Sequence, residues 1–174
     1  MRRILDLLYR ASGGLAALCL AMIALTIIAQ VIGRIIGVTI DSTESGGFFL
    51  AGTTFLGMAY TLKTGGHVRV SLLVARLRGR AAWLAEVWIC LFGSFACLFA
   101  SWETWGMVQD SIRFGDLSPG LLAIPFWIPQ AVMLSGLGLF SLAMLDELVL
   151  VLRGRRPGFA APHETALEGL EITE

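Results

Sequence analysis

The chain has 174 residues, of which 56% are hydrophobic and only 15% are charged. Soluble domains typically carry about 25% charged and about 45–50% apolar residues, so this composition excludes a disordered chain and argues against a soluble enzyme domain. The 13 basic and 13 acidic residues cancel formally, and a chain without net positive charge offers no general basic field for nucleic acid. The composition therefore indicates an integral membrane protein with no nucleic-acid partner.

Four stretches of the sequence are long and apolar enough to cross a bilayer, which takes about 20 residues of helix. Uncharged runs cover residues 11–33, 45–62, 87–102 and 117–145. None of them alternates like a strand of a transmembrane barrel, so the sequence predicts an all-α integral membrane protein with four transmembrane helices. We expect a single four-helix membrane domain of residues 1–153, with spans at about 11–35, 45–63, 83–104 and 125–148.

The fourth apolar run is too long for one straight crossing and contains three prolines. Proline is accepted in the first turn of a helix, so Ile124-Pro125 is the expected start of the fourth span. Pro129 then lies in the first turns, where a missing backbone N–H costs least. Residues 117–124 are expected to form an apolar approach segment at the membrane interface or against protein.

The basic residues are distributed unevenly between the two sides of this topology. Eleven of the 13 lie before the first span, between the second and third spans, or after the fourth. Lysine and arginine in short loops favour the cytoplasmic side, so both termini and the loop at residues 63–80 are expected there. Residues 154–174, which contain four glutamates, are expected to form a mobile acidic cytoplasmic tail.

The loop after the second span contains a helical pattern of its own. Its apolar residues recur at helical spacing, while its arginines lie on the opposite side: Val70, Leu73, Val74 and Leu77 against Arg69, Arg76, Arg78 and Arg80. Such a segment favours an amphipathic helix lying in the plane of the cytoplasmic interface, between the second and third spans. The alternative is a plain basic loop that anchors the topology.

The residues that usually carry chemistry are few and scattered. The three cysteines lie within the spans and form no CxxC pair, and neither His67 nor His163 lies within a span. No metal-ligand cluster, phosphate-binding loop or hydrolase motif is present. The sequence therefore predicts no catalytic residues, no cofactor and no metal site.

Charged residues near the ends of the spans are the best candidates for contacts. Arg34 follows Gln30 by one helical turn near the outer end of the first span, so the two share a face. They are candidates for a contact with a partner or a specific lipid, the alternative being an Arg34 that simply extends toward the headgroups. Glu86, one turn into the third span, is expected to pair with a neighbouring helix or an arginine of the inner loop.

Small residues recur at four-residue spacing on two of the spans, as Gly13, Ala17 and Ala21 and as Ala96 and Ala100. Such rows permit close packing of helices in a membrane. The pattern is common, and it fits packing within the four-helix domain as well as docking onto a larger partner.

Two segments carry a resemblance to a known family. One is the acidic stretch that enters the second span, DSTESGGFFLAGTTFLGMAYTLKTGG, with Glu44 at an acidic position of that family. The other is GGHVRVSLL, where residues 66–70 match a Gly/Glu-His-Val-Arg-Val signature. Over about residues 5–155 the chain resembles the small membrane subunit, or Q-type small permease, of tripartite ATP-independent periplasmic (TRAP) transporters. Ser71 departs from the family, which often has Asp there.

The resemblance implies a function through partners. TRAP systems combine a periplasmic substrate-binding protein, a large transmembrane subunit that is thought to carry the sodium and substrate sites, and this small subunit. The small subunit would be a non-catalytic scaffold in the bacterial inner membrane, bound to the static part of the large one and surrounded by lipid. The system would import an organic acid with a sodium gradient.

The resemblance also assigns expectations to individual residues. His67 and Arg69 are expected to stabilise the inner loop or its contact with the large subunit. The outer segment from Trp105 onward is expected to lie near the docked binding protein, with candidate contacts at Asp110, Arg113 and Asp116.

Two other classes of protein are alternatives to this one. A self-contained small carrier or channel, formed by homo-oligomerisation, would need a polar stripe along a shared axis, and the polar residues of the spans are too scattered to form one. A membrane redox subunit would need histidines within the spans to hold haem, and there are none.

Overall fold

The computed structural model describes residues 2–39, 42–64, 80–120 and 122–153. These residues form four α-helices: α1 (Arg2–Ile35), α2 (Thr43–Lys63), α4 (Arg80–Phe114) and α5 (Trp127–Leu152). The all-helical class predicted from the sequence is therefore confirmed for the described part of the chain.

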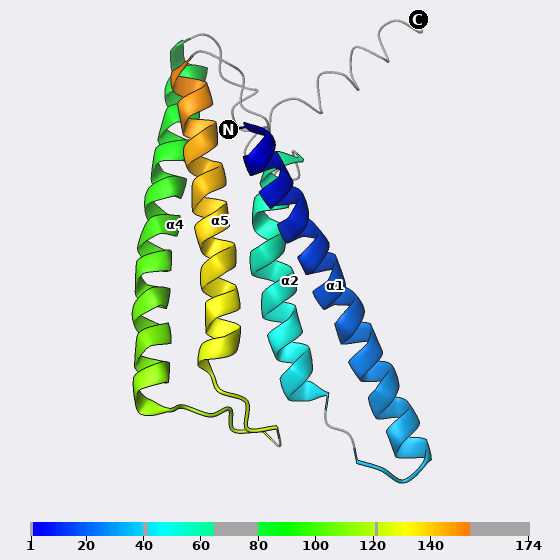
Figure 1. The fold of residues 1–174 in the computed structure, drawn as a ribbon. Coiled ribbons are helices and arrows are strands. Elements are labelled where there is room, and N and C mark those ends of the chain that lie inside the picture. The colour runs from blue at the N-terminus through cyan, green and yellow to red at the C-terminus, as the bar shows by residue number, and fades with distance from the viewer. Residues whose placement is uncertain (1, 40–41, 65–79, 121, 154–174) are drawn as a thin grey trace, which may run out of the picture.

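The four helices lie side by side in a single layer, in the order α4, α5, α2, α1 (Figure 1). Within the described residues, close packing joins α1 to α2, α2 to α5, and α5 to α4. The inner helices are therefore covered on two sides and the outer ones on one. Burial follows this order, since α5 is much more buried along its apolar window than α1 or α4.

The outer helices of the layer expose long rows of large apolar side chains. On α4 the exposed row is aromatic and includes Trp88, Phe92, Phe95, Phe99 and Trp102. On α1 it is aliphatic and includes Leu18, Leu25, Ile28, Ile32 and Ile35. A water-soluble monomer rarely exposes apolar patches of this extent to water. Such patches are expected where lipid or a partner chain covers them.

Consecutive helices run in opposite directions, so the layer has two distinct ends (Figure 1). The start of α1 and the end of α5 lie together with Lys63, and we call this the Lys63 end. The opposite end holds the end of α1 and the start of α2, and we call it the Arg34 end. This arrangement places the first and last described residues at the same end of the molecule.

Three of the described helices, α1, α4 and α5, are both long and apolar enough to cross a membrane. Helix α2 has 21 residues, or about 30 Å at about 1.5 Å per residue, which matches the hydrocarbon thickness. Its glycines and threonines lower its hydropathy, and its central position in the layer removes much of it from lipid contact.

Two of the helices are longer than the predicted spans, because a helix can continue through polar residues beyond the membrane-length apolar run. Helix α1 begins at Arg2 rather than near residue 11, and α4 continues to Phe114 rather than ending near residue 104. Both helices are followed by a glycine at positive φ, Gly37 at 79° and Gly115 at 67°. Glycine accepts this left-handed conformation without the penalty of a Cβ, so it ends a helix cleanly.

Glycine allows α2 and α5 to cross closely. Gly136 lies against the backbone and Cβ of Phe55, and a Cβ at this position would overlap with them. Gly138, two residues further along α5, has open space where its Cβ would be. The close contact of α5 with α2 therefore lies at Gly136.

The contact between α1 and α2 lies mostly beside the row of small residues Gly13, Ala17 and Ala21. Gly13 packs on the Tyr60 ring, and the Ser12 hydroxyl donates a hydrogen bond of 2.7 Å to the backbone carbonyl of Leu56. Ala17 and Ala21 are exposed, so only the first member of that small-residue row is used within the described residues. The α1 face that meets α2 instead passes through Ala16, which is buried.

Candidate functional sites at the two ends of the helix layer

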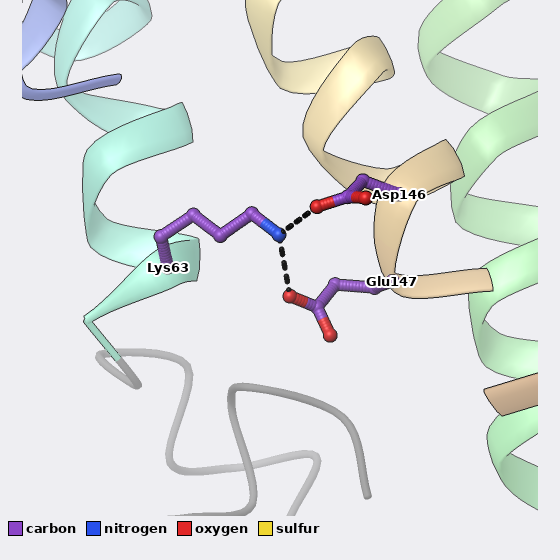
Figure 2. Close-up of polar contacts among 3 residues, drawn as sticks. All are labelled: Lys63, Asp146 and Glu147. Atoms are coloured by element: carbon purple, nitrogen blue, oxygen red, sulfur yellow. Dashed lines mark hydrogen bonds and ion pairs between the residues drawn. The ribbon is translucent and has the colours of Figure 1, made fainter. Parts of the chain in front are cut away.

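A cluster of charged side chains joins the inner helices at the Lys63 end. Lys63 is the last residue of α2, and its Nζ lies 2.5 Å from Oδ2 of Asp146 and 2.9 Å from Oε1 of Glu147. Figure 2 shows the lysine extending from α2 to the two carboxylates, which come from consecutive residues of α5. One ammonium therefore bridges two acids on the neighbouring helix.

Burial makes this cluster costly to break. The Glu147 side chain is 0% exposed, and those of Lys63 and Asp146 are 19% and 27% exposed. Lys63 Nζ also lies 5.5 Å from the centroid of the Tyr9 ring, in range of a cation–π interaction with α1. A buried ion pair adds little over a packed apolar pair, but removing one partner leaves an uncompensated charge. The cluster therefore connects α2 to α5 through two ion pairs and to α1 through the Tyr9 ring.

The sequence alone did not predict this cluster. In the sequence Lys63 directly follows the uncharged run of the second span, and Asp146 and Glu147 directly follow that of the fourth, which by itself does not pair them. The available signal was positional, because the second and fourth spans run in the same direction, so that the lysine at the end of one and the two acids near the end of the other lie at similar depth.

Glu86 lies on α4 near the same end of the layer and is half-buried. It takes part in a polar or electrostatic interaction, as does Glu147 beyond its contact with Lys63. The expected partner, a neighbouring helix or an inner-loop arginine, stays a prediction. His67, Arg69 and the predicted interfacial helix lie outside the described residues, as does the acidic tail at 154–174.

At the Arg34 end, the structure brings together two of the predicted contact residues. Gln30 and Arg34 line a pocket of about 230 Å³, together with Gly37, Val38 and Thr39. Gln30 is half-buried, and its Oε1 accepts a hydrogen bond of 2.5 Å from the hydroxyl of Ser42. Ser42 therefore uses its side chain to connect α2 to α1 and makes no side-chain cap on its own helix.

Glu44 connects the start of α2 to the segment between α4 and α5. Its Oε2 accepts a hydrogen bond of 3.2 Å from the backbone N–H of Leu122. Its carboxylate also lies directly against Gly120, so that a Cβ there would overlap with it. The acidic residue singled out from the sequence thus holds part of the approach segment.

The rest of this segment folds into a tight turn. Leu117 and Pro125 form an antiparallel bridge, and Ser118 exchanges hydrogen bonds with Ile124, whose N–H donates to the serine hydroxyl at 3.1 Å. Helix α5 begins at Trp127, which places Pro129 in its first turn as predicted. The turn sets the distance between the Arg34 ends of α4 and α5.

The three residues predicted to face a binding protein all lie at the Arg34 end and are exposed. Asp110 and Arg113 are on the last turns of α4, and Asp116 follows Gly115. The backbone carbonyl of Asp116 accepts a hydrogen bond of 3.0 Å from Phe126, while its carboxylate stays at the surface. Their position leaves them accessible to a partner from outside the layer.

Across residues 2–39, 42–64, 80–120 and 122–153, no three His, Cys, Asp or Glu side chains lie close enough to hold a metal ion. The three cysteines are free thiols, and Cys90 is buried. Charged groups gather at the two ends of long apolar helices. Together with three helices that can each span a bilayer, this arrangement defines an integral membrane protein.

Residues 22–154 match the sequence model of the DctQ component of tripartite ATP-independent periplasmic transporters. The match covers well over half of the chain, so the chain belongs to this family and is a small membrane component of a TRAP transporter. The family is a component of a transporter and is not known as an enzyme family. No curated protein and no solved structure matches the chain.

Proposed function

We propose that the chain is the non-catalytic scaffold subunit of a TRAP transporter that imports an organic acid with a sodium gradient. It would bind a large multi-span subunit in the bacterial inner membrane and act with a periplasmic binding protein. The observation that carries this proposal is the single layer of helices, whose outer members expose apolar side chains over many turns. Such a layer offers wide surface to a membrane partner and encloses no pathway of its own.

The distribution of charge supports a scaffold over a carrier. In the described helices, charged residues lie toward the ends, and the middle turns of α1, α2 and α5 carry none. A carrier needs polar or charged groups at depth in the membrane to bind its ion or substrate. In the proposal those groups belong to the large subunit.

The proposed orientation places the Lys63 end in the cytoplasm and the Arg34 end in the periplasm, with four crossings and both termini inside. Its support is the bias of lysine and arginine toward the segments at the Lys63 end. The alternating direction of consecutive helices along the chain is compatible with this orientation. Asp110, Arg113 and Asp116 would then face the binding protein.

Copurification tests the proposal directly. The full-length chain, affinity-tagged after Glu174 and extracted from its own membranes in mild detergent, should retain a large multi-span protein at a fixed ratio. Liposomes holding both chains, with the binding protein outside and a sodium gradient inward, should take up one of a panel of labelled organic acids. Uptake by the small chain alone, as a homo-oligomer, would overturn the proposal.

The Gly-His-Val-Arg-Val segment at residues 66–70 can be tested separately. We propose that His67 and Arg69 stabilise the inner loop or its contact with the large subunit. The double variant His67→Ala with Arg69→Ala should reduce recovery of the large subunit, whereas the tail variant His163→Ala with Arg155→Ala should not. Full recovery and full uptake with the first variant would refute this role.

The exposed acids of the Arg34 end are tested by charge reversal. Asp110→Lys with Asp116→Lys should weaken cross-linking of the binding protein to the membrane complex and slow uptake. Asp6→Lys changes an exposed acid at the Lys63 end and is the matched control. Unchanged uptake with the double reversal would place the binding protein elsewhere.

A further inference from the structure

The pocket at the end of α1 combines a cation with further hydrogen-bond donors. Its five lining residues include Arg34, Gln30 and Thr39 and no acidic residue. The Gln30 carbonyl oxygen is engaged by the Ser42 hydroxyl, so the amide group that remains is the donor end of the side chain. A guanidinium, an amide and a hydroxyl together favour an anionic, oxygen-rich ligand.

The surface around the pocket is apolar and faces outward. Ile27 and Val31 lie seven and three residues before Arg34, on the same face of α1, and are 51% and 56% exposed. Past the pocket, Ile35 and Ile36 are 80% and 67% exposed. A ligand that reaches the guanidinium therefore lies against aliphatic side chains, which suits an amphiphile better than a free anion.

The dimensions of the pocket agree with this class of ligand. Its volume of about 230 Å³ is several times the ~30 Å³ that one water occupies in the liquid, which leaves room for a phosphate and part of its glycerol. Gly37 brings the chain out of α1 at positive φ, and the turn that follows forms one wall of the pocket.

We propose that this pocket binds the phosphate of a phospholipid headgroup. The phosphate pairs with Arg34 and accepts hydrogen bonds from the Gln30 amide, while the acyl chains lie along Val31 and Ile27. The site lies at the end of the layer opposite the buried Lys63 cluster.

Native mass spectrometry of the full-length chain with defined lipids tests the site. Phosphatidylglycerol should bind more tightly than diacylglycerol, which has the same tails and no phosphate. Arg34→Gln should weaken phosphatidylglycerol binding by about tenfold, the scale of one lost charge-assisted contact. Arg113→Gln removes the other described arginine of the same end and should leave binding unchanged.

Comparing these lipids and variants distinguishes a phospholipid from the other possible ligands. Equal binding of diacylglycerol, or equal loss with Arg113→Gln, would overturn the proposal. Displacement of the lipid by millimolar inorganic phosphate would assign the pocket to a free anion and would also overturn it. Gln30→Glu adds a negative charge while Arg34 stays in place, so it should weaken lipid binding even if Arg34→Gln fails to fold.

Discussion

The Nζ of Lys63 and the Oε1 of Glu147 lie 2.9 Å apart, although 84 residues of sequence separate them. The pair joins the last residue of α2 to a fully buried position of α5. Asp146 shares the same ammonium, so the lysine holds two adjacent carboxylates on one helix. The two inner helices of the layer are thereby fixed at one depth relative to each other.

Removing the cation should destabilise the protein strongly. In Lys63→Met the buried Glu147 carboxylate loses its described countercharge, and loss of one partner of a buried pair typically costs about 3–5 kcal/mol. Adding Glu147→Gln should recover much of this loss, because the buried side chain that has lost the lysine then carries no charge. Thermal unfolding in mild detergent compares the variants.

The control for this experiment is Arg153→Gln, an exposed basic residue one residue beyond α5. It should change the free energy of unfolding by no more than about 0.5 kcal/mol. If Lys63→Met behaved like this surface change, the cluster would have no role in stability.

Adding one methyl group to α5 should distinguish two glycines that are close in sequence. Gly136→Ala places a Cβ into the backbone of Phe55 and should cost about 1–3 kcal/mol as the helices separate. Gly138→Ala meets open space and should be neutral or stabilising by up to about 1 kcal/mol, because alanine favours the helix. Unfolding midpoints of the two variants in the same detergent provide the comparison, and equal midpoints would contradict the close crossing.

Removing the charge of Glu44 should loosen the turn before α5. In Glu44→Gln the Leu122 N–H loses its ionised acceptor, so its amide hydrogen should exchange severalfold faster. Glu103→Gln, an exposed acid on α4, should not change this rate. Hydrogen exchange followed by mass spectrometry measures both, and equal protection in the two variants would rule out the contact.

Labelling from one side of the membrane should distinguish the two ends of the layer. In a background with Cys19→Ala, Cys90→Ala and Cys97→Ala, Thr39→Cys should react with a membrane-impermeant maleimide added to spheroplasts. Arg153→Cys should react only after the membrane is opened. The reverse labelling pattern would show that the orientation is opposite to the proposed one. Labelling of both cysteines from outside would contradict the four-crossing topology.

The helices were predictable because apolar runs of bilayer length leave the backbone few other structures. Their ends were not, since α4 continues past Glu103 to Phe114, where Thr104, Val108 and Ser111 are buried by packing that the uncharged run does not predict. Gln30 and Arg34 were correctly placed together because four residues make one turn of a single helix. The partners of Glu44 and Lys63 could not be found this way, because they lie about 80 residues away in the sequence and are brought close only by the packing of the helices.

The helix order has a consequence for the energetics of the molecule. In a compact bundle every helix touches several others, but here stability adds up one neighbouring interface at a time, as in a linear array of repeats. Losing α1 would leave the α2–α5–α4 interfaces in place, whereas losing α5 would cut the array in two. Unfolding should accordingly begin at the outer helices. A partner that covers one face of the layer would contact all four helices and make their unfolding cooperative.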